Sequence, residues 1–224
     1  MLPPNSCKFN FNSIRKRQIS LLRRRLSIKF KRIQEKECVE MALNQWFEKA
    51  MSADDYIEKM EKNKEGLLHI YDTFNLPDHT DLYENIREKN LRAIVLTEDW
   101  CGDAMLNVPI LLRIAEKANI DVRMLLRDDN LELMDQYLTN GKSRSIPIFI
   151  FINEEGNEVA KWGPRAAKVQ EFIDESRAAL PPKDAPDHEE KANEMYKFIG
   201  KSFRDNQDFW DEVYNSLINK LKSI

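Results

Sequence analysis

The chain has 224 residues and a net charge of −3, and its 42% of hydrophobic and 33% of charged residues exclude an intrinsically disordered protein. No stretch reaches the roughly 18 apolar residues of a membrane span, and six scattered glycines leave no Gly-rich phosphate-binding loop. Because the three cysteines and three histidines lie far apart in sequence, we expect no disulfide framework, no metal site, no cofactor and a reducing, cytoplasmic location.

The first 40 residues form a basic leader, with eleven Lys and Arg residues against three Glu residues. Three interpretations remain open. The leader resembles a mitochondrial transit peptide, which would place the protein in mitochondria. It also suits a tail for nucleic acid or another anionic surface, but no aromatic residues are interleaved with its arginines, so we expect no nucleic-acid partner. Alternatively, residues 1–40 are disordered or an over-extended start, and the protein proper begins at Met41.

Residues 41–180 are predicted to form one domain with additional helices at its N-terminal end. A helix is expected from Ser52 to the residues before Pro77, because apolar side chains recur at helical spacing (Tyr56, Met60, Leu67, Tyr71 and Phe74). A shorter helix follows near Thr80. The continuous apolar run over 91–97 has the length of a strand that is buried on both faces.

Helices and strands then alternate. We expect a helix from Cys101 to about Ala118, a strand over 120–126, a helix over 130–141, a hairpin over 145–163 and a helix to about Leu180. A strand, a crossover helix and a second strand imply a parallel pair, and the hairpin adds antiparallel strands to it. The predicted fold is therefore α/β, with a central mixed sheet flanked by helices.

Residues 181–224 are predicted to be a helical C-terminal extension. Apolar residues recur there at helical spacing (Met195, Ile199, Phe203, Trp210, Val213, Leu217 and Leu221). The simplest interpretation is one or two amphipathic helices that pack on the domain through Trp210, Val213 and Leu217. The alternative is that their apolar face forms a dimer contact, and the oligomeric state stays open.

Four features in this order resemble the thioredoxin superfamily. Trp100-Cys101-Gly102-Asp103 stands at the predicted strand-to-helix junction, as the Trp-Cys-Gly-Pro-Cys motif of that superfamily does. Pro109 matches the proline in the helix that follows, and Ile146-Pro147 matches the segment where the superfamily has a cis-proline facing the cysteine. Gly163 matches the glycine that closes the hairpin. The resemblance covers about residues 90–178 and implies a thioredoxin-like fold.

More narrowly, the segments around "EDWCGDA" and "RSIP" resemble a bacterial thioredoxin-like group that carries Trp-Cys-Gly-Asp without a second cysteine. Two residues depart from a dithiol thioredoxin. Ala104 replaces the resolving cysteine, which excludes an internal disulfide at this motif. Val95 replaces the buried aspartate that assists proton transfer in the superfamily.

Cys101 is the candidate catalytic residue. A nucleophilic cysteine must be a thiolate, and a helix N-terminus favours that form through its partial positive charge. We expect the junction to expose Cys101, although a buried cysteine with a packing role is the alternative. The carboxylates of Glu98, Asp99 and Asp103 should raise its pKa, and Arg144, close to Pro147 in sequence, is expected to offset them and stabilise the thiolate.

Two functions from different classes follow. In the first, Cys101 exchanges disulfides as a monothiol enzyme, with protein thiols or disulfides as substrates and an external low-molecular-weight thiol as reductant. In the second, the chain is a non-catalytic module that binds a peptide or protein. In both, the resemblance implies that the partner lies against Trp100, Gly102, Asp103, Ile146 and Pro147.

Overall fold

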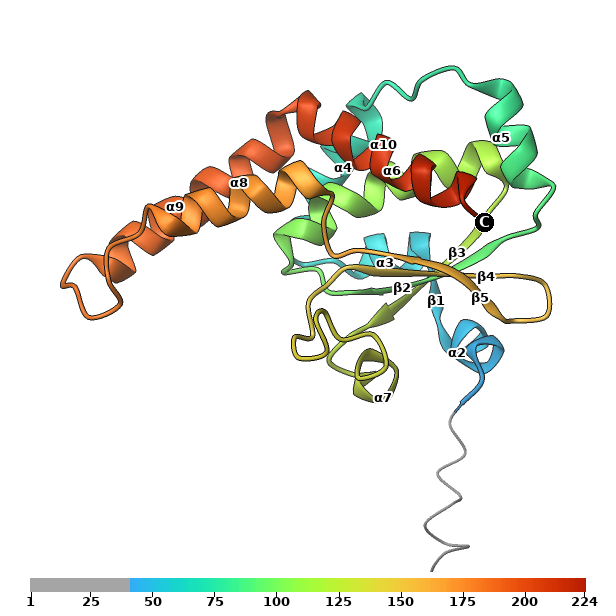
Figure 1. Cartoon of the computed structure of the whole chain (residues 1–224), viewed down its shortest axis with the longest axis horizontal. Coiled ribbons are helices and arrows are strands. Elements are labelled where there is room, and N and C mark those ends of the chain that lie inside the picture. Colours follow the sequence, from blue (N-terminus) through green and yellow to red (C-terminus); the bar gives the residue numbers. More distant parts are fainter. Residues whose placement is uncertain (1–40) are drawn as a thin grey trace, which may run out of the picture. The chain divides into compact units, whose positions relative to one another are not determined.

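A computed structural model of the chain describes residues 41–224, and the basic leader lies outside these described residues. Residues 42–224 form one compact unit around a five-stranded mixed sheet in the order β1-β3-β2-β4-β5 (Figure 1). The strands are β1 (Met51–Ser52), β2 (Arg92–Thr97), β3 (Asp121–Leu126), β4 (Ile148–Ile152) and β5 (Glu158–Trp162). β2 and β3 are parallel, and the other neighbours are antiparallel. The expected mixed α/β sheet is confirmed.

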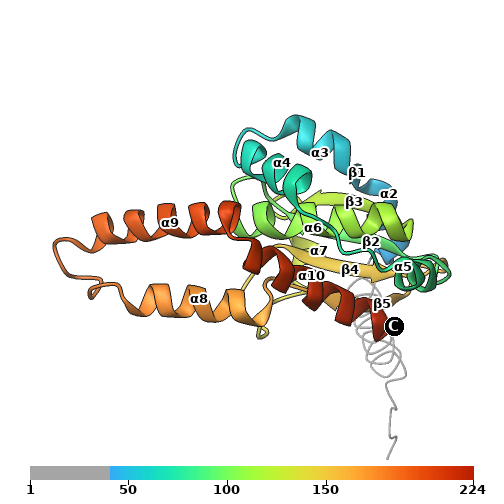
Figure 2. The same ribbon diagram turned by 90° about the horizontal axis from the view of Figure 1, so that it is seen from above.

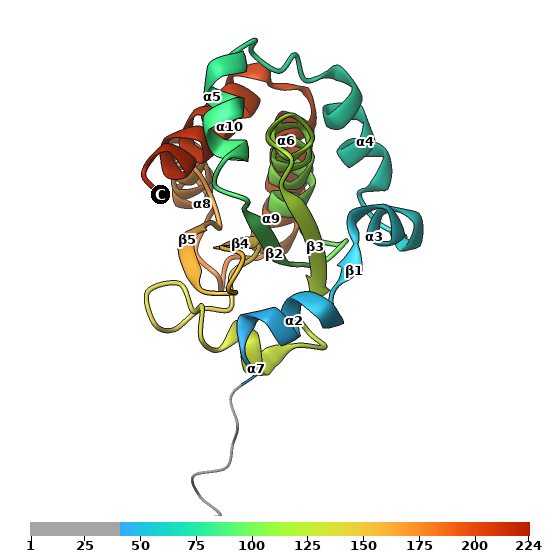
Figure 3. The same cartoon turned by 90° about the vertical axis from the view of Figure 1, so that its right-hand side faces the viewer.

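The two central strands are buried because helices cover both faces of the sheet. All five residues of β4 and all but the first of β2 are buried, as their continuous apolar sequences predict. α2 (Leu43–Lys49) and α7 (Leu131–Met134) lie on one face, whereas α5 (Thr80–Arg87) and α6 (Gly102–Ala118) lie on the other (Figure 3). The helix expected from Cys101 to Ala118 therefore sits at the centre of the second layer.

The helix predicted from Ser52 to Pro77 is interrupted, which corrects the sequence interpretation. It forms α3 (Ala53–Lys59) and α4 (Lys64–Thr73), preceded by the short edge strand β1, which was not expected. The carboxylate of Asp99 accepts hydrogen bonds from the backbone N–H groups of Glu61 and Lys62 at 2.9 and 3.0 Å. Asn63 then adopts a left-handed conformation, with φ of 56°. A side chain distant in sequence thus satisfies backbone groups that a continuous helix would have paired internally.

The helix predicted over 130–141 is also shorter than expected. α7 ends at Met134, and the chain then turns through Asn140 and Gly141, whose φ values are 53° and 67°. Thr139 and Ser143 pair across this turn. Gly141 therefore serves a tight turn and does not close a long helix.

Three helices follow the sheet: α8 (Ala167–Ala178), α9 (His188–Asp205) and α10 (Gln207–Lys222). α8 and α9 run side by side, and α10 returns along the domain (Figure 2). α9 and α10 contact α6, and α10 also contacts β5. Trp210, Val213 and Leu217 are buried, so the predicted packing of this segment on the domain is confirmed. Among residues 41–224, no helix combines the length and the hydrophobicity needed to cross a membrane.

A chain shortened to begin at Met41 is expected to melt within a few degrees of the full chain. Residues 42–224 form a compact unit, and the core described above is built from residues of this unit. Differential scanning calorimetry of the two proteins measures this directly. A drop of about 4 °C or more, which for a chain of this size corresponds to roughly 1 kcal/mol or more, would show that residues 1–40 stabilise the domain.

Candidate functional site

Cys101 occupies the N-cap position of α6, directly after the loop that leaves β2. No side-chain hydrogen bond caps the helix here, but the backbone N–H groups of Asp103 and Ala104, which a helix N-terminus leaves unpaired, favour the charged form of the sulfur and lower its pKa. Its S–H group donates to the carbonyl oxygen of Ile146 at 3.5 Å. The Ile146–Pro147 peptide bond is cis, as the resemblance implied. The structure therefore brings Cys101, Ile146 and Pro147 together across 45 residues of sequence.

The thiol of Cys101 is buried, contrary to the expectation that the junction exposes it. Its exposed fraction is 8%. Burial is the largest cause that raises the pKa of Cys101, to about 11, and the carboxylate of Asp103 raises it further. The N–H groups of Asp103 and Ala104 and the charge of Arg165 lower it, but they do not compensate for burial. In the resting protein the thiol is thus protonated at neutral pH.

Asp103 forms a buried ion pair with Arg165. Nε and Nη2 of Arg165 donate to the two carboxylate oxygens, both at 2.6 Å, and the side chains are only 13% and 14% exposed. The pKa of Asp103 is raised overall, because its burial outweighs the hydrogen bonds and the charge of Arg165, which lower it. A bidentate pair engages both oxygens, so the carboxylate has its partner within the protein.

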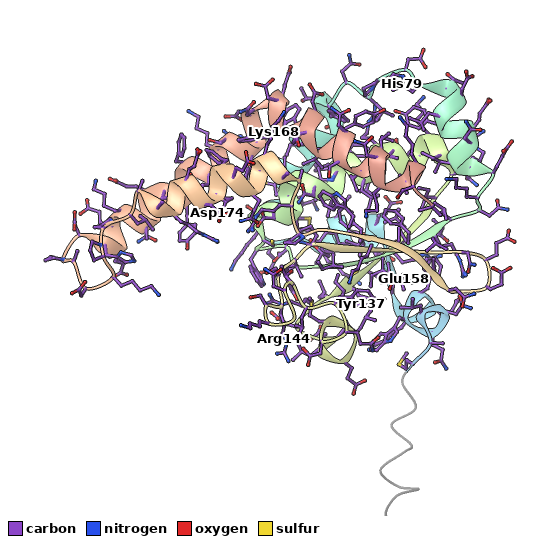
Figure 4. All side chains as sticks on the ribbon, in the orientation of Figure 1. His79, Tyr137, Arg144, Glu158, Lys168 and Asp174 are labelled. Atoms are coloured by element: carbon purple, nitrogen blue, oxygen red, sulfur yellow. The ribbon has the colours of Figure 1, made fainter. Side chains whose placement is uncertain are left out.

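Arg144, expected to stabilise the thiolate, pairs with Asp135 instead. Its Nε and Nη2 atoms donate to the Asp135 carboxylate at 2.6 and 2.8 Å, and each of the two side chains is nearly half exposed. Figure 4 shows Arg144 at the margin of the domain. The cation whose charge lowers the pKa of Cys101 is Arg165, which sequence reasoning missed. No spacing in the sequence could identify Arg165, because its approach to α6 depends on how the segment after β5 packs.

Glu98 and Asp99 were expected to repel a thiolate, but their carboxylates are engaged in the surrounding loops. Glu98 is 7% exposed and accepts a hydrogen bond from the backbone N–H of Asp128 at 2.8 Å. Asp99 accepts the two N–H groups that precede α4. Asp103 is therefore the acid with the largest effect on the Cys101 thiol.

Trp100 and Gly102 flank the cysteine. The Trp100 ring is 45% exposed, and the guanidinium of Arg127 lies 4.9 Å from its centroid, so its role is at the surface and not in the core. A Cβ atom added to Gly102 would lie 4.0 Å from Cδ2 of Phe203. The C-terminal helix α9 therefore reaches the start of α6, a contact that the sequence did not predict. Within residues 41–224, no three His, Cys, Asp or Glu side chains are grouped to hold a metal ion.

Comparisons with known proteins identify the family and the fold of the chain. A thioredoxin family model matches residues 50–178, more than half of the chain. A crystal structure of a Pseudomonas aeruginosa protein of unknown function superposes with a TM-score of 0.59 at 16% identity, covering 82% of this chain and 98% of that chain. An HIV epitope-scaffold protein superposes with a TM-score of 0.57 at 13% identity, covering 82% and 99%. These two similarities concern the fold alone. A search of curated proteins finds no match.

Proposed function

This chain belongs to the thioredoxin family, and on that premise we propose that it exchanges thiols and disulfides through the single sulfur of Cys101. The observation that carries the proposal is the placement of this sulfur. It lies at the N-cap of α6, where the backbone N–H groups of Asp103 and Ala104 lower its pKa, and its S–H group donates to the carbonyl that precedes cis-Pro147. A thiolate formed there has donors already oriented toward its charge.

The exchange takes place in two steps. The Cys101 thiol gives up its proton, and the thiolate attacks one sulfur of a protein disulfide or of a glutathionylated cysteine. A new S–S bond to Cys101 forms while the old S–S bond breaks, and the departing sulfur takes up a proton. Because Ala104 offers no second sulfur, an external thiolate must attack the other sulfur of the mixed disulfide, whose bond to Cys101 breaks, and Cys101 is freed and takes up a proton. The external thiol is then joined to that sulfur as a disulfide. Where that sulfur belongs to glutathione this disulfide is the final product, and where it belongs to a protein a further external thiol displaces it without Cys101. A reducing compartment such as the cytoplasm would supply these thiols.

The substrate lies as an extended segment beside Ile146 and Pro147, with Trp100 as an exposed apolar neighbour. The carbonyl of Ile146 points to the sulfur, so a peptide paired with the backbone there would bring its own cysteine to Cys101. The exposed Trp100 ring offers contact area next to it. In the resting protein the Cys101 thiol uses the Ile146 carbonyl, and an arriving substrate replaces this hydrogen bond.

A second candidate function is binding of a peptide or protein without exchange. The burial and raised pKa of Cys101 favour it, because a protonated sulfur is a poor nucleophile. In this case the partner lies against the exposed Trp100 ring, beside the buried Ile146 and Pro147, and the cysteine has a packing role.

Oxidised glutathione is expected to give one adduct, at Cys101, that persists until reduced glutathione is added. The experiment uses a Cys7→Ser/Cys38→Ser background, in which Cys101 is the remaining thiol, and intact mass spectrometry at pH 9, where more thiolate is present. Cys101→Ser in the same background is the control and should gain no mass. A folded protein that forms no adduct over a day at pH 9 would favour the binding module.

Ala104→Cys provides a second arm of the same experiment. Ala104 is buried one turn along α6, and its backbone N–H lowers the pKa of Cys101. A cysteine at this position is expected to expel glutathione without external thiol and to form an internal disulfide. If the glutathione adduct on Cys101 lasted as long in Ala104→Cys as in the parent, a cysteine at position 104 would be unable to displace it.

A further inference from the structure

The Asp103–Arg165 pair lies at the first turn of the helix that carries the reactive sulfur. All three guanidinium nitrogens of Arg165 donate hydrogen bonds. Two reach the Asp103 carboxylate, and Nη1 donates to the side-chain oxygen of Gln170 at 2.9 Å. Because Gln170 belongs to α8, Arg165 connects α6 with the helix that follows the sheet. The two charged side chains are only 14% and 13% exposed, so both charges are largely shielded from water.

The segment that carries Arg165 is held against the same loop that faces Cys101. Gly163 has φ of 120°, and a Cβ atom added to it would lie 2.2 Å from the carbonyl oxygen of Pro147. Asn107 of α6 donates its side-chain N–H to the carbonyl of Pro164 at 2.9 Å. Only a glycine permits this approach to Pro147. The backbone before Arg165 therefore packs against the Pro147 loop and against α6, and these two contacts fix the position of the Arg165 guanidinium.

The charges that face the sulfur come from few elements. α6 contributes Asp103, and the segment after β5 contributes Arg165. α8 contributes Arg177, which acts on Asp103, and α3 contributes the Tyr56 hydroxyl, whose own pKa is sensitive to Cys101. Glu98 and Asp99, in the loop before Cys101, are bound to backbone N–H groups. α9 packs an aromatic ring, Phe203, near Gly102, and the loop before Pro147 contributes the Ile146 carbonyl.

The geometry points to Arg165 as a positioning residue of the Cys101 site, which holds Asp103 as an ionised partner and so keeps the charge beside the sulfur constant. This inference rests on the proposed exchange function and deepens it. Without Arg165, the two largest causes that lower the pKa of Asp103 are lost, so this buried carboxylate is expected to take up its proton at a higher pH than in the parent. The charge beside Cys101 would then change with pH in the range where exchange takes place.

The pH dependence of Cys101 alkylation tests this role. Iodoacetamide rates are measured on the full chain in the Cys7→Ser/Cys38→Ser background, from pH 5 to pH 10. The parent is expected to accelerate about tenfold per pH unit throughout. In Arg165→Gln, the alkylation rate should rise less steeply over the pH interval in which Asp103 loses its proton. At pH values above this interval, the rate should be about tenfold or more below the value extrapolated from lower pH. Asp103→Asn/Arg165→Gln should restore a single straight line, and Arg165→Lys should retain it.

The matched control is Arg204→Gln. Arg204 forms a similar two-bond pair with Asp205 at 2.7 and 3.0 Å, but on the exposed surface of α9. Its alkylation profile should match that of the parent. A merely structural role of Arg165 would lower the melting temperature of Arg165→Gln and leave the profile straight, which would overturn the inference. A pH interval of less steep acceleration that persists in Asp103→Asn/Arg165→Gln would also overturn the inference, because this variant has no carboxylate at position 103.

If Arg165→Gln does not fold, Asp103→Asn and Asp103→Asn/Arg165→Gln are compared. The former retains an unpaired cation near the sulfur, so its thiol pKa should be lower and its rate at pH 8 several-fold higher. Equal rates would overturn the inference. Alkylation requires no disulfide exchange, so the outcome is independent of the glutathione experiment, whose failure would affect the proposed function alone.

Discussion

Alkylation of Cys101 by iodoacetamide is expected to accelerate about a thousandfold between pH 7 and pH 10, or about tenfold per pH unit. The thiolate is the reacting species, and the pKa of Cys101 is raised to about 11 by burial and by Asp103. At pH 7 the folded protein should therefore react more slowly than free glutathione. Mass spectrometry in the Cys7→Ser/Cys38→Ser background measures the rate at this one thiol.

The same protein in urea serves as the control for this prediction. Unfolding removes both the burial of the sulfur and the neighbouring carboxylate, so Cys101 should then react at neutral pH like an ordinary cysteine, whose pKa is about 8.5. A folded-state rate that levels off near pH 7 would contradict the prediction. It would mean that the two backbone N–H groups and Arg165 stabilise the thiolate more than burial and Asp103 destabilise it.

The raised pKa of Cys101 also makes the stability of the protein depend on pH. The unfolded thiol ionises first as pH rises, so the contribution of the neutral thiol is fully present below about pH 8.5 and is lost as pH approaches 11. The roughly 2.5 pKa units between 8.5 and 11 correspond to about 3 kcal/mol at most. Because burial also raises the pKa of Tyr56, the effect of Cys101 is isolated by comparing the parent with Cys101→Ala over this interval.

Replacing Trp210 by alanine is expected to lower the free energy of unfolding by about 3 kcal/mol or more. The side chain is 2% exposed, its Nε1 donates to the carbonyl of Phe203 at 2.8 Å, and its ring meets the edge of His69 at a centroid distance of 6.0 Å. The substitution leaves a large void between α10 and its neighbours and removes the partner of a buried carbonyl. Urea denaturation followed by circular dichroism measures the loss.

Tyr196→Ala is the control for the packing of the C-terminal helices. Tyr196 lies on α9 with an exposed fraction of 58%, so its loss should change stability by less than about 0.5 kcal/mol. If Trp210→Ala left stability unchanged and instead dissociated a dimer, its side chain would act at an interface between copies of the chain. That outcome would contradict the burial of Trp210 within one protomer.

The breaks in two predicted helices show how contacts distant in sequence modify local patterns. The periodic apolar residues from Tyr56 to Phe74 favour one helix, but Asp99 binds the N–H groups of Glu61 and Lys62 and ends α3 before α4 begins. Periodicity reports which face of a segment is apolar, and it carries no information on a carboxylate 37 residues later. The pairing of that carboxylate exists only after the loop before Cys101 has folded.

By itself, the sequence determined the elements whose formation depends on local pattern. The apolar runs of β2 and β4 predicted buried strands, the residues after Cys101 predicted α6, and the spacing of Trp210, Val213 and Leu217 predicted a packed helical face. The motif around Cys101 also predicted the family, since four features in a set order are specific.

Only the tertiary structure decided the electrostatics of the site. Whether Cys101 is exposed depends on the segment before Pro147 that closes over it, and the choice of Arg165 over Arg144 depends on how the chain after β5 packs on α6. A pKa responds to burial and to charges within a few ångströms, whichever part of the chain supplies them. Asp103 and Arg165 are 62 residues apart in sequence, whereas Oδ1 of Asp103 and Nε of Arg165 are 2.6 Å apart in the structure. Only the fold brings these two atoms together.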